Sequence, residues 1–287
     1  MANLVRPLLA RDSALIMGIL NVTPDSFSDG GEFHSLDLAI RHAEQMVADG
    51  ADIIDVGGES TRPGADPVER QEELDRVIPV IECLSTRFDV PISIDTQKPN
   101  VMHEAVKGGA QMINDVNGLR AEGAVAIAAK CDVPVCLMHM LDIPKKMQEK
   151  PDYNEVTTEV SSFLRSRIDA CLASGIDNAD ILIDPGIGFG KTLNHNLELL
   201  NHVGQMIEDL GCEMLIGVSR KSLIGMQLGR EVDSRLPASL GLAVQAVIKG
   251  AKIVRVHDVL ETHDAIRMIE AVRNYDKPNN KNKDKSF

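Results

Sequence analysis

Residues 18–31 read Gly-Ile-Leu-Asn-Val-Thr-Pro-Asp-Ser-Phe-Ser-Asp-Gly-Gly, where an apolar run gives way to a polar loop. The run from Ala14 to Leu20 predicts a buried strand, which ends at Asn21. Pro24 and the two final glycines break regular structure after it. Because connecting loops usually have about four to six residues, this longer loop favours a function of its own. We predict a mobile lid over a polar ligand.

The same order of aliphatic strand, polar loop and helix recurs along the whole chain. We expect eight strands, at residues 14–20, 53–58, 92–95, 112–116, 135–139, 181–184, 214–219 and 253–256. We expect helices at residues 36–49, 66–87, 98–108, 122–130, 155–173, 195–209, 235–249 and in a last stretch that ends near 274. Aliphatic strands without clean alternation are typical of a parallel sheet covered on both faces.

Eight such units in 287 residues favour one α/β domain, a (β/α)8 TIM barrel over residues 1–275, rather than a doubly wound sheet. The Asn-, Lys- and Asp-rich residues 276–287 predict a disordered tail.

The sequence also suggests where two of the helices start. Ser35 is suited to cap the helix at 36–49, and Asp66-Pro67 with Glu69 has the N-cap, N1 and N3 residues of a start.

Composition excludes several classes of function. The formal charge of −13 argues against a nucleic-acid surface, although a few local cations could still bind an anion. The five cysteines are odd in number and contain no C-x-x-C pair, which fits a reducing cytosol. The chain shows neither a signal peptide nor an apolar run of membrane-spanning length. We therefore expect a soluble cytoplasmic protein without nucleic-acid or membrane partners.

A polar or charged group stands at the end of every predicted strand. Any one of them could be a helix cap or a solvated loop residue. In a TIM barrel, however, the carboxyl ends of the strands meet at one face, which carries the chemistry. We therefore expect one site, lined by Asn21, Thr61, Arg62, Asp95, Asn114, Asp115, His139, Asp184, Ser219, Arg220, Lys221, Arg255 and His257.

These groups fall into two chemical kinds. One kind suits an anion, because the planar arginine fork matches phosphate oxygens; its members are Asn21, Arg62, Arg255 and His257. The other kind mixes donors and acceptors, as the edge of a flat heterocycle requires; its members are Asp95, Asn114, Asp184 and Lys221. The pattern therefore predicts a ligand with an anionic part and a ring.

The segment Asp184-Pro-Gly-Ile-Gly-Phe-Gly-Lys191 matches neither a P-loop nor a dinucleotide fingerprint. We interpret it as a turn that brings backbone and Phe189 close to the ligand. Met138 and Phe189 could sandwich a ring, although a methionine at a strand end is more often plain core. Ser222 is expected to start a helix whose free N–H groups can bind a carboxylate. No zinc-ligand pattern and no Ser–His–acid arrangement is visible.

Seven motifs together resemble the bacterial dihydropteroate synthase family, in that family's order and over residues 14–273. They are Asn21-Val-Thr-Pro-Asp-Ser-Phe-Ser-Asp-Gly-Gly31, Gly57-Gly-Glu-Ser-Thr-Arg-Pro-Gly-Ala65, Ser93-Ile-Asp-Thr96, Ile113-Asn-Asp-Val116, Asp184-Pro-Gly-Ile-Gly-Phe189, Gly217-Val-Ser-Arg-Lys-Ser222 and Arg255-Val-His257. The first two loops are highly specific, whereas Ser-Ile-Asp-Thr alone would mean little.

The resemblance implies that 7,8-dihydropterin-6-ylmethyl diphosphate condenses with 4-aminobenzoate to give 7,8-dihydropteroate and pyrophosphate, with Mg²⁺ as cofactor. It implies that the catalytic residues are Asp95, Lys221 and Asn21, and that Asn21 is the metal ligand. Pyrophosphate would leave first, and Asp95 would stabilise the resulting methylene cation. The family also implies a homodimer and competition by sulfonamides.

The resemblance also assigns residues to three subsites. The implied pterin residues are Asp95, Asn114, Asp184, Lys221, Met138 and Phe189. The implied diphosphate residues are Asn21, Thr61, Arg62, Arg255 and His257. The implied aminobenzoate residues are Phe27, Thr61, Pro63, Phe189 and Ser222.

Two other functions are weighed against this one. Pterin-binding methyltransferases, which use a corrinoid partner, share the barrel and the pterin groups but do not need the diphosphate set. A non-catalytic pterin-binding barrel would not need to keep the acid Asp95 together with the anion-binding Arg255 and His257. A pyrophosphate-release assay with and without aminobenzoate separates the three.

Overall fold

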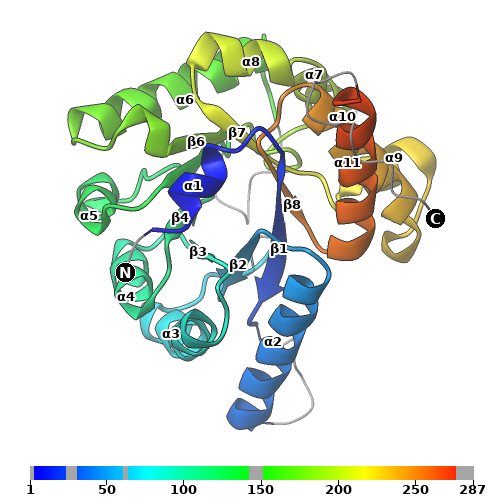
Figure 1. Cartoon of the computed structure of the whole chain (residues 1–287). Coiled ribbons are helices and arrows are strands. Elements are labelled where there is room, and N and C mark those ends of the chain that lie inside the picture. Colours follow the sequence, from blue (N-terminus) through cyan, green and yellow to red (C-terminus); the bar gives the residue numbers. More distant parts are fainter. Residues whose placement is uncertain (1–2, 24–30, 61–63, 142–150, 276–287) are drawn as a thin grey trace, which may run out of the picture.

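The computed structural model describes residues 3–23, 31–60, 64–141 and 151–275. In these residues, eight parallel strands close into a barrel in sequence order, with β8 paired to β1 (Figure 1). The strands are β1 (Leu15–Asn21), β2 (Ile53–Gly57), β3 (Ile92–Asp95), β4 (Met112–Asp115), β5 (Val135–Met138), β6 (Ile181–Asp184), β7 (Glu213–Gly217) and β8 (Ile253–Val256). The predicted TIM barrel is confirmed.

Helices surround the barrel (Figure 1). They are α1 (Val5–Leu9), α2 (Gly31–Ala48), α3 (Arg70–Arg87), α4 (Pro99–Gly108), α5 (Ala124–Cys131), α6 (Val156–Ala173), α7 (Leu193–Asn201), α8 (Val203–Leu210), α9 (Ser222–Leu228), α10 (Leu236–Ile248) and α11 (Val259–Arg273), with 3-10 turns at Asn178–Asp180 and Val232–Ser234. Among the described residues, no helix combines the length and the hydropathy that a membrane span requires.

Two predicted helix starts were wrong. Helix α2 begins at Gly31, so Ser35 lies inside the helix instead of capping it. Helix α3 begins at Arg70, and Glu69 is its N-cap residue with extended backbone at φ −65° and ψ 147°. In the non-helical segment before α3, the side chain of Glu59 accepts a hydrogen bond from the N–H of Val68 at 3.4 Å.

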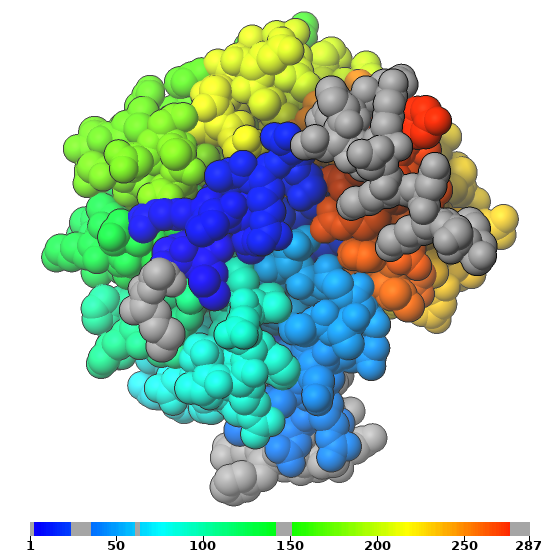
Figure 2. Space-filling model, viewed as in Figure 1, coloured from blue at the N-terminus to red at the C-terminus, as the bar shows by residue number. Residues whose placement is uncertain are grey.

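The predicted helix at 195–209 is two helices, α7 and α8, because the backbone at His202 (φ −102°, ψ 13°) leaves the helical region. Helix α1 was not predicted at all, since five residues are too few to show a helical period. Val5 and Leu8 of α1 pack into a buried cluster with Leu15 and Ile253, so α1 closes the amino-terminal end of the barrel. In Figure 2 this blue segment lies across the middle of the face shown.

Side chains inside the barrel change character along each strand. Inward-facing residues alternate with outward-facing ones, so the next inward residue lies two positions further on. The first inward residues are apolar and share the cluster closed by α1; they include Ile53, Met112, Leu182 and Ile253. The next ones are Asp55, Asn114, Asp184 and Arg255. A step of two residues therefore leads from the apolar core to a polar layer.

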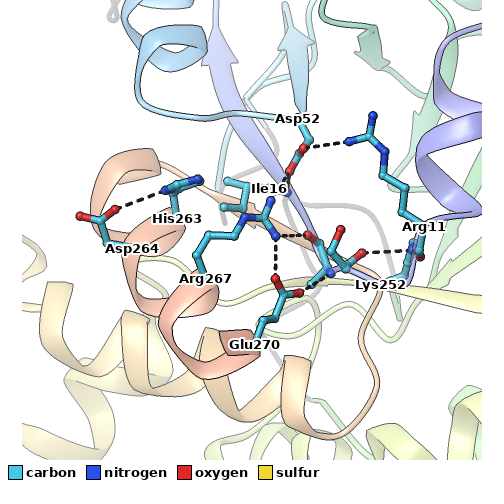
Figure 3. Close-up of polar contacts among 10 residues, drawn as sticks. Arg11, Ile16, Asp52, Lys252, His263, Asp264, Arg267 and Glu270 are labelled. Carbon is cyan, nitrogen blue, oxygen red and sulfur yellow. Dashed lines mark hydrogen bonds and ion pairs between the residues drawn. The ribbon is translucent and has the colours of Figure 1, made fainter. Parts of the chain in front are cut away.

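Ion pairs tie α11 to the amino-terminal ends of β1 and β2 (Figure 3). Asp52 Oδ2 accepts hydrogen bonds from the N–H of Ile16 at 2.9 Å and from Arg267 Nη2 at 3.1 Å. Arg267 Nη1 also donates to Glu270 Oε2 at 2.9 Å, and Glu270 Oε1 accepts from the N–H of Ala14 at 2.7 Å. Backbone and side-chain groups at this end of the barrel therefore satisfy one another.

Candidate active site

An arginine held between two carboxylates forms the centre of the site at the carboxyl ends of the strands. Arg255 donates from Nε to Asp55 Oδ2 at 2.6 Å and from Nη2 to Asp95 Oδ2 at 2.7 Å. Asn114 donates from Nδ2 to the same Asp55 oxygen at 3.1 Å. Strands β2, β3, β4 and β8 thus bring together four polar side chains, which we call the Arg255 cluster.

Burial dominates the electrostatics of the Arg255 cluster. It raises the pKa of Asp95 to about 7 against the lowering effect of Arg255, and Asp55 adds to the rise. Burial also acts to lower the pKa of Arg255, but Asp55 and Asp95 hold that pKa above its usual value. The guanidinium therefore keeps its charge, whereas Asp95 can change its charge near neutral pH.

A second group of side chains surrounds the turn after β6. Lys221 Nζ donates to the carbonyl oxygen of Ile187 at 2.6 Å and lies 4.1 Å from the centre of the Phe189 ring, as a cation over an aromatic face. Asp184 Oδ1 accepts from the N–H of Gly186 at 2.7 Å. Burial lowers the pKa of Lys221 to about 8, although Asp184 opposes this shift. Burial raises the pKa of Asp184, while the Gly186 N–H and Lys221 act to lower it.

An apolar patch completes this part of the site. Met138 at the end of β5 is buried with Val116 and Met140, and the partly buried Phe189 packs against them. Met138 and Phe189, which the sequence suggested as two sides of a ring sandwich, thus belong to one cluster. Ser222 is the first residue of α9, as predicted, and Lys221 is its N-cap residue.

The ends of β1 and β8 border the Arg255 cluster. A Cβ placed on Gly57 would lie 3.8 Å from Asn21 Oδ1 and 3.6 Å from Asp95 Cβ, so Asn21 and Asp95 face the same small space. The N–H of His257 donates to Ser219 Oγ at 3.2 Å, and His257 Nδ1 lies 3.0 Å from that oxygen. The buried Ser219 therefore fixes the imidazole at the edge of the site.

Known proteins match this chain at high sequence identity. The family described as pterin binding enzyme matches residues 17–257. Dihydropteroate synthase of Escherichia coli K12 is 52% identical over 246 residues, which is 86% of this chain and 87% of that protein. The chain belongs to the dihydropteroate synthase family.

Solved structures of dihydropteroate synthases superpose on the whole barrel. The Yersinia pestis enzyme, solved with a sulfonamide drug complex, is 49% identical with a TM-score of 0.87, covering 93% of this chain and 96% of that one. The Xanthomonas albilineans enzyme, solved with 4-aminobenzoic acid, is 48% identical with a TM-score of 0.86, covering 91% of this chain and 94% of that one.

Some of the residues implied by the dihydropteroate synthase resemblance are not tested by the geometry. Phe27, Thr61, Arg62 and Pro63 lie outside the described residues, as do most of the predicted lid and the tail at 276–287. Within the part of the chain that is described, no group of three His, Cys, Asp or Glu side chains is placed to hold a metal ion.

Three strand-end residues have structural partners instead of facing the Arg255 cluster. Asp115 accepts hydrogen bonds from the N–H groups of Asn117 and Leu119, both at 2.7 Å. Arg220 forms an ion pair with Asp258 beside α11. His139 lies 3.0 Å from the ammonium of Lys191 through its Nδ1. A polar residue at a strand end was therefore a good but imperfect guide to the site.

Asp55 is a site residue that our reading of the sequence missed. It is fully buried, and among the described residues its Oδ1 has no hydrogen-bond partner although its Oδ2 accepts two hydrogen bonds. Asp55 lies in the middle of β2, whereas the predicted site residues follow the ends of the strands. A signal existed, because a carboxylate inside an apolar strand must be paired when it is buried.

Proposed function

We propose that the chain catalyses the condensation of 7,8-dihydropterin-6-ylmethyl diphosphate with 4-aminobenzoate to 7,8-dihydropteroate and pyrophosphate. The observation that carries the proposal is the Arg255 cluster beside Asp184 and Lys221, found in a chain about half identical to known dihydropteroate synthases. The cluster combines an acid with an anion-binding cation in one buried space.

In this proposal, residues of the Arg255 cluster and residues near the turn after β6 bind the pterin ring. Carboxylates accept hydrogen bonds from ring N–H and amino groups, which suits Asp95 and Asp184, and the amide of Asn114 can both donate and accept. Lys221, still mostly protonated at neutral pH with a pKa of about 8, can donate to a ring carbonyl. Met138 and Phe189 supply apolar contact to the ring faces.

The diphosphate is held at the other side of the same space. Arg255 offers a planar fork to phosphate oxygens, and His257 and Asn21 lie at neighbouring strand ends. Thr61 and Arg62 are proposed to join them on the basis of the family resemblance alone.

Asn21 also fits as a ligand of Mg²⁺. Magnesium prefers oxygen ligands and is commonly held by one or two protein groups together with substrate phosphates. The amide oxygen of Asn21 is such a ligand, and it borders the space shared with Asp95. When bound, Mg²⁺ would neutralise part of the diphosphate charge.

The chemistry proceeds in two steps in this proposal. The bond between the pterin methylene carbon and the diphosphate oxygen breaks, and the electron pair leaves with pyrophosphate. Arg255 and His257 stabilise the negative charge of this leaving group. The methylene cation that remains is delocalised into the ring and stabilised by the carboxylate of Asp95. The aniline nitrogen of 4-aminobenzoate then forms the new C–N bond and releases a proton, so no strong general base is needed.

The aminobenzoate site lies next to the pterin site. The N–H groups that begin α9 at Ser222 suit its carboxylate, and Phe189 borders its ring. Phe27, Thr61 and Pro63 are proposed to complete this site. Sulfonamides are proposed to compete for it, as the complex of the Yersinia pestis relative with such a drug suggests.

Pyrophosphate release measured with and without 4-aminobenzoate tests the function. We expect release at a steady catalytic rate only when both substrates and Mg²⁺ are present. Methyl transfer from a methyl-tetrahydrofolate to a corrinoid protein, without pyrophosphate release, would favour the methyltransferase. Pterin binding with neither reaction would favour the non-catalytic barrel.

The active form is proposed to be a homodimer in the cytoplasm. Met268 and Val272 lie four residues apart on one face of α11, Tyr275 follows two residues after its end, and each of the three is at least 65% exposed. Such an apolar stripe is typical of an interface. The five cysteines are unpaired, as expected in a reducing compartment. Sedimentation of the wild type and of Val272→Glu tests the dimer, since the variant is expected to be monomeric.

A further inference from the structure

Lys191, which follows the glycine-rich turn after β6, is buried in an unusual way. Only 2% of its surface is exposed, although lysine is one of the residue types that are almost never fully buried without a partner of opposite charge. Among the described residues, no carboxylate lies within ion-pair distance of its ammonium, so all the partners of its ammonium are neutral.

Three acceptors surround the Lys191 ammonium. The carbonyl oxygen of Phe189 lies 2.9 Å away, Nδ1 of His139 lies 3.0 Å away, and the carbonyl oxygen of His139 lies 3.5 Å away. Burial lowers the pKa of His139 to about 3, and Lys191 lowers it further, so the imidazole is neutral and its Nδ1 can accept. The ammonium thus joins the turn after β6 to the end of β5.

The turn at 185–190 fits this position closely. A Cβ on Gly186 would lie 1.9 Å from the carbonyl oxygen of His139, so only glycine allows the turn to approach β5 so tightly. The side chain of Asn196 accepts from the N–H of Gly188 at 2.7 Å, and Tyr153 Oη donates to Gly190 O at 3.0 Å. Lys191 is the ionisable member of this set of contacts; burial lowers its pKa to about 7, although Asp184 opposes this shift.

The turn at 185–190 also contacts Lys221. The carbonyl oxygen of Ile187 accepts from Lys221 Nζ at 2.6 Å, and the Phe189 ring lies beneath that ammonium. A Cβ on Gly188 would come within 3.1 Å of Lys221 Cδ, so the turn also packs against the lysine stem. A shift of the turn would therefore displace the Phe189 ring and the carbonyl oxygen that accepts from Lys221.

We propose that Lys191 is a positioning residue for the pterin site: its ammonium fixes the turn at 185–190 so that Lys221 and Phe189 meet the ring. Lys191 itself touches no reacting atom. The inference rests on the proposed function, because it names a further residue on which the affinity of the same site depends.

A pair of matched variants tests the proposal. Lys191→Met keeps the length and apolar stem of the side chain but removes the ammonium. Lys252→Met is the control, because Lys252 is also buried and also donates to backbone carbonyls, those of Arg11 and Ser13, but at the opposite end of the barrel.

Lys191→Met is expected to weaken binding of 7,8-dihydropterin-6-ylmethyl diphosphate about tenfold in an equilibrium titration. At saturating pterin substrate, kcat and the KM for 4-aminobenzoate are expected to stay within about twofold of wild type. Amide hydrogen exchange in 185–190 should become faster, whereas exchange in β1 should not. Lys252→Met is expected to lower thermal stability without changing either substrate's binding.

Several outcomes would overturn the proposal. One is wild-type pterin affinity in a folded Lys191→Met variant, and another is an equal loss for both substrates. If Lys191→Met does not fold, Lys191→Gln, which keeps N–H donors without the charge, decides by the same titration. If neither variant folds, Lys191 supports the whole barrel instead of one turn, which also contradicts the proposal. A wild-type chain without pyrophosphate release would overturn the proposed function instead.

Discussion

Asp52 and Asp55 are three residues apart in the sequence: Asp52 precedes β2 at the amino-terminal end of the barrel, whereas Asp55 lies within β2 and its side chain meets groups at the carboxyl end. Each accepts a hydrogen bond from an arginine near the end of the chain. Asp52 pairs with Arg267 at 3.1 Å, and Asp55 pairs with Arg255 at 2.6 Å. The two pairs look alike, but their surroundings differ.

At the amino-terminal end each carboxylate of the network has partners on both oxygens: Asp52 pairs with Arg267 and, at 3.9 Å, with Arg11, and Glu270 pairs with Arg267 and the N–H of Ala14 (Figure 3). At the carboxyl end Arg255 faces two buried carboxylates, and Asp55 keeps an unpartnered oxygen among the described residues. A buried polar atom without a partner costs free energy. The groups at the amino-terminal end are thus paired within the protein, whereas the carboxyl end holds two buried carboxylates against one arginine.

The largest effect is expected for Asp95→Asn. Opposite charges about 4 Å apart interact by about 4 kcal/mol at an effective dielectric constant near 20, which is roughly a thousandfold in kcat if the interaction exists only in the transition state. Stopped-flow or steady-state pyrophosphate release measures this. Binding of the pterin diphosphate should weaken far less than kcat falls, because the asparagine side chain can still accept a hydrogen bond from the ring. The free energy of unfolding should change little, because Asp55 still pairs with Arg255. A kcat equal to that of wild type would refute the cation role.

Asp55→Asn and Asp52→Asn compare the two ends directly. Removing the Asp55 charge loosens the hold on Arg255, and a hydrogen bond to a charged group is worth about 1.5–3 kcal/mol, so kcat/KM for the pterin diphosphate should fall about 10- to 100-fold. Asp52→Asn should leave kcat/KM unchanged and lower the free energy of unfolding. The distinction between the ends fails if both variants lose activity equally.

The pH dependence should separate activity from stability at the carboxyl end. In the folded chain Lys221 has a pKa of about 8, whereas the pKa of a solvated lysine in the unfolded chain is 10.5. Between these two pH values the unfolded chain therefore binds more protons than the folded one. The free energy of unfolding therefore rises with pH in this window, and Lys221→Met should reduce the rise by about 2 kcal/mol in urea titrations at pH 8 and 10. Over the same window kcat/KM for the pterin substrate should fall in wild type and equally in Lys252→Met.

The smallest effect is expected for Arg267→Met at the amino-terminal end. Its ion pairs with Asp52 and Glu270 are only partly buried, with 31% of the arginine side chain exposed. We expect the free energy of unfolding to fall by about 1–2 kcal/mol, measured by denaturant titration, with both KM values unchanged. A large loss of activity would show that the two ends of the barrel are coupled.

The strand order and most of the site were predictable because each strand is an aliphatic run that ends on a polar residue. Asp95, Asn114, Asp184 and Arg255 were found by this rule, and the structure brings them to one end of the barrel. The rule depends on strand ends, so it missed the carboxylate of Asp55 in mid-strand.

Other features depend on contacts that a local pattern does not contain. Helix α1 is too short to show a period, and its role comes from packing with β1 and β8 at the barrel end. Lys191 was named only as the end of a glycine-rich segment. Its burial between two strand ends arises from the close approach of Gly186 to the carbonyl of His139, which is a long-range contact.

The pairing of Asp55 with Arg255 joins residues that are 200 positions apart in the chain. During synthesis from the amino terminus, Asp55 and Asp95 emerge from the ribosome long before the arginine that neutralises them. Their charges would oppose early burial of the incomplete barrel, and the arrival of β8 supplies both the closing strand and the counter-ion. The residue that we propose binds the leaving group therefore also completes the fold, so a chain truncated before β8 should leave the barrel unclosed and be readily cleaved by proteases.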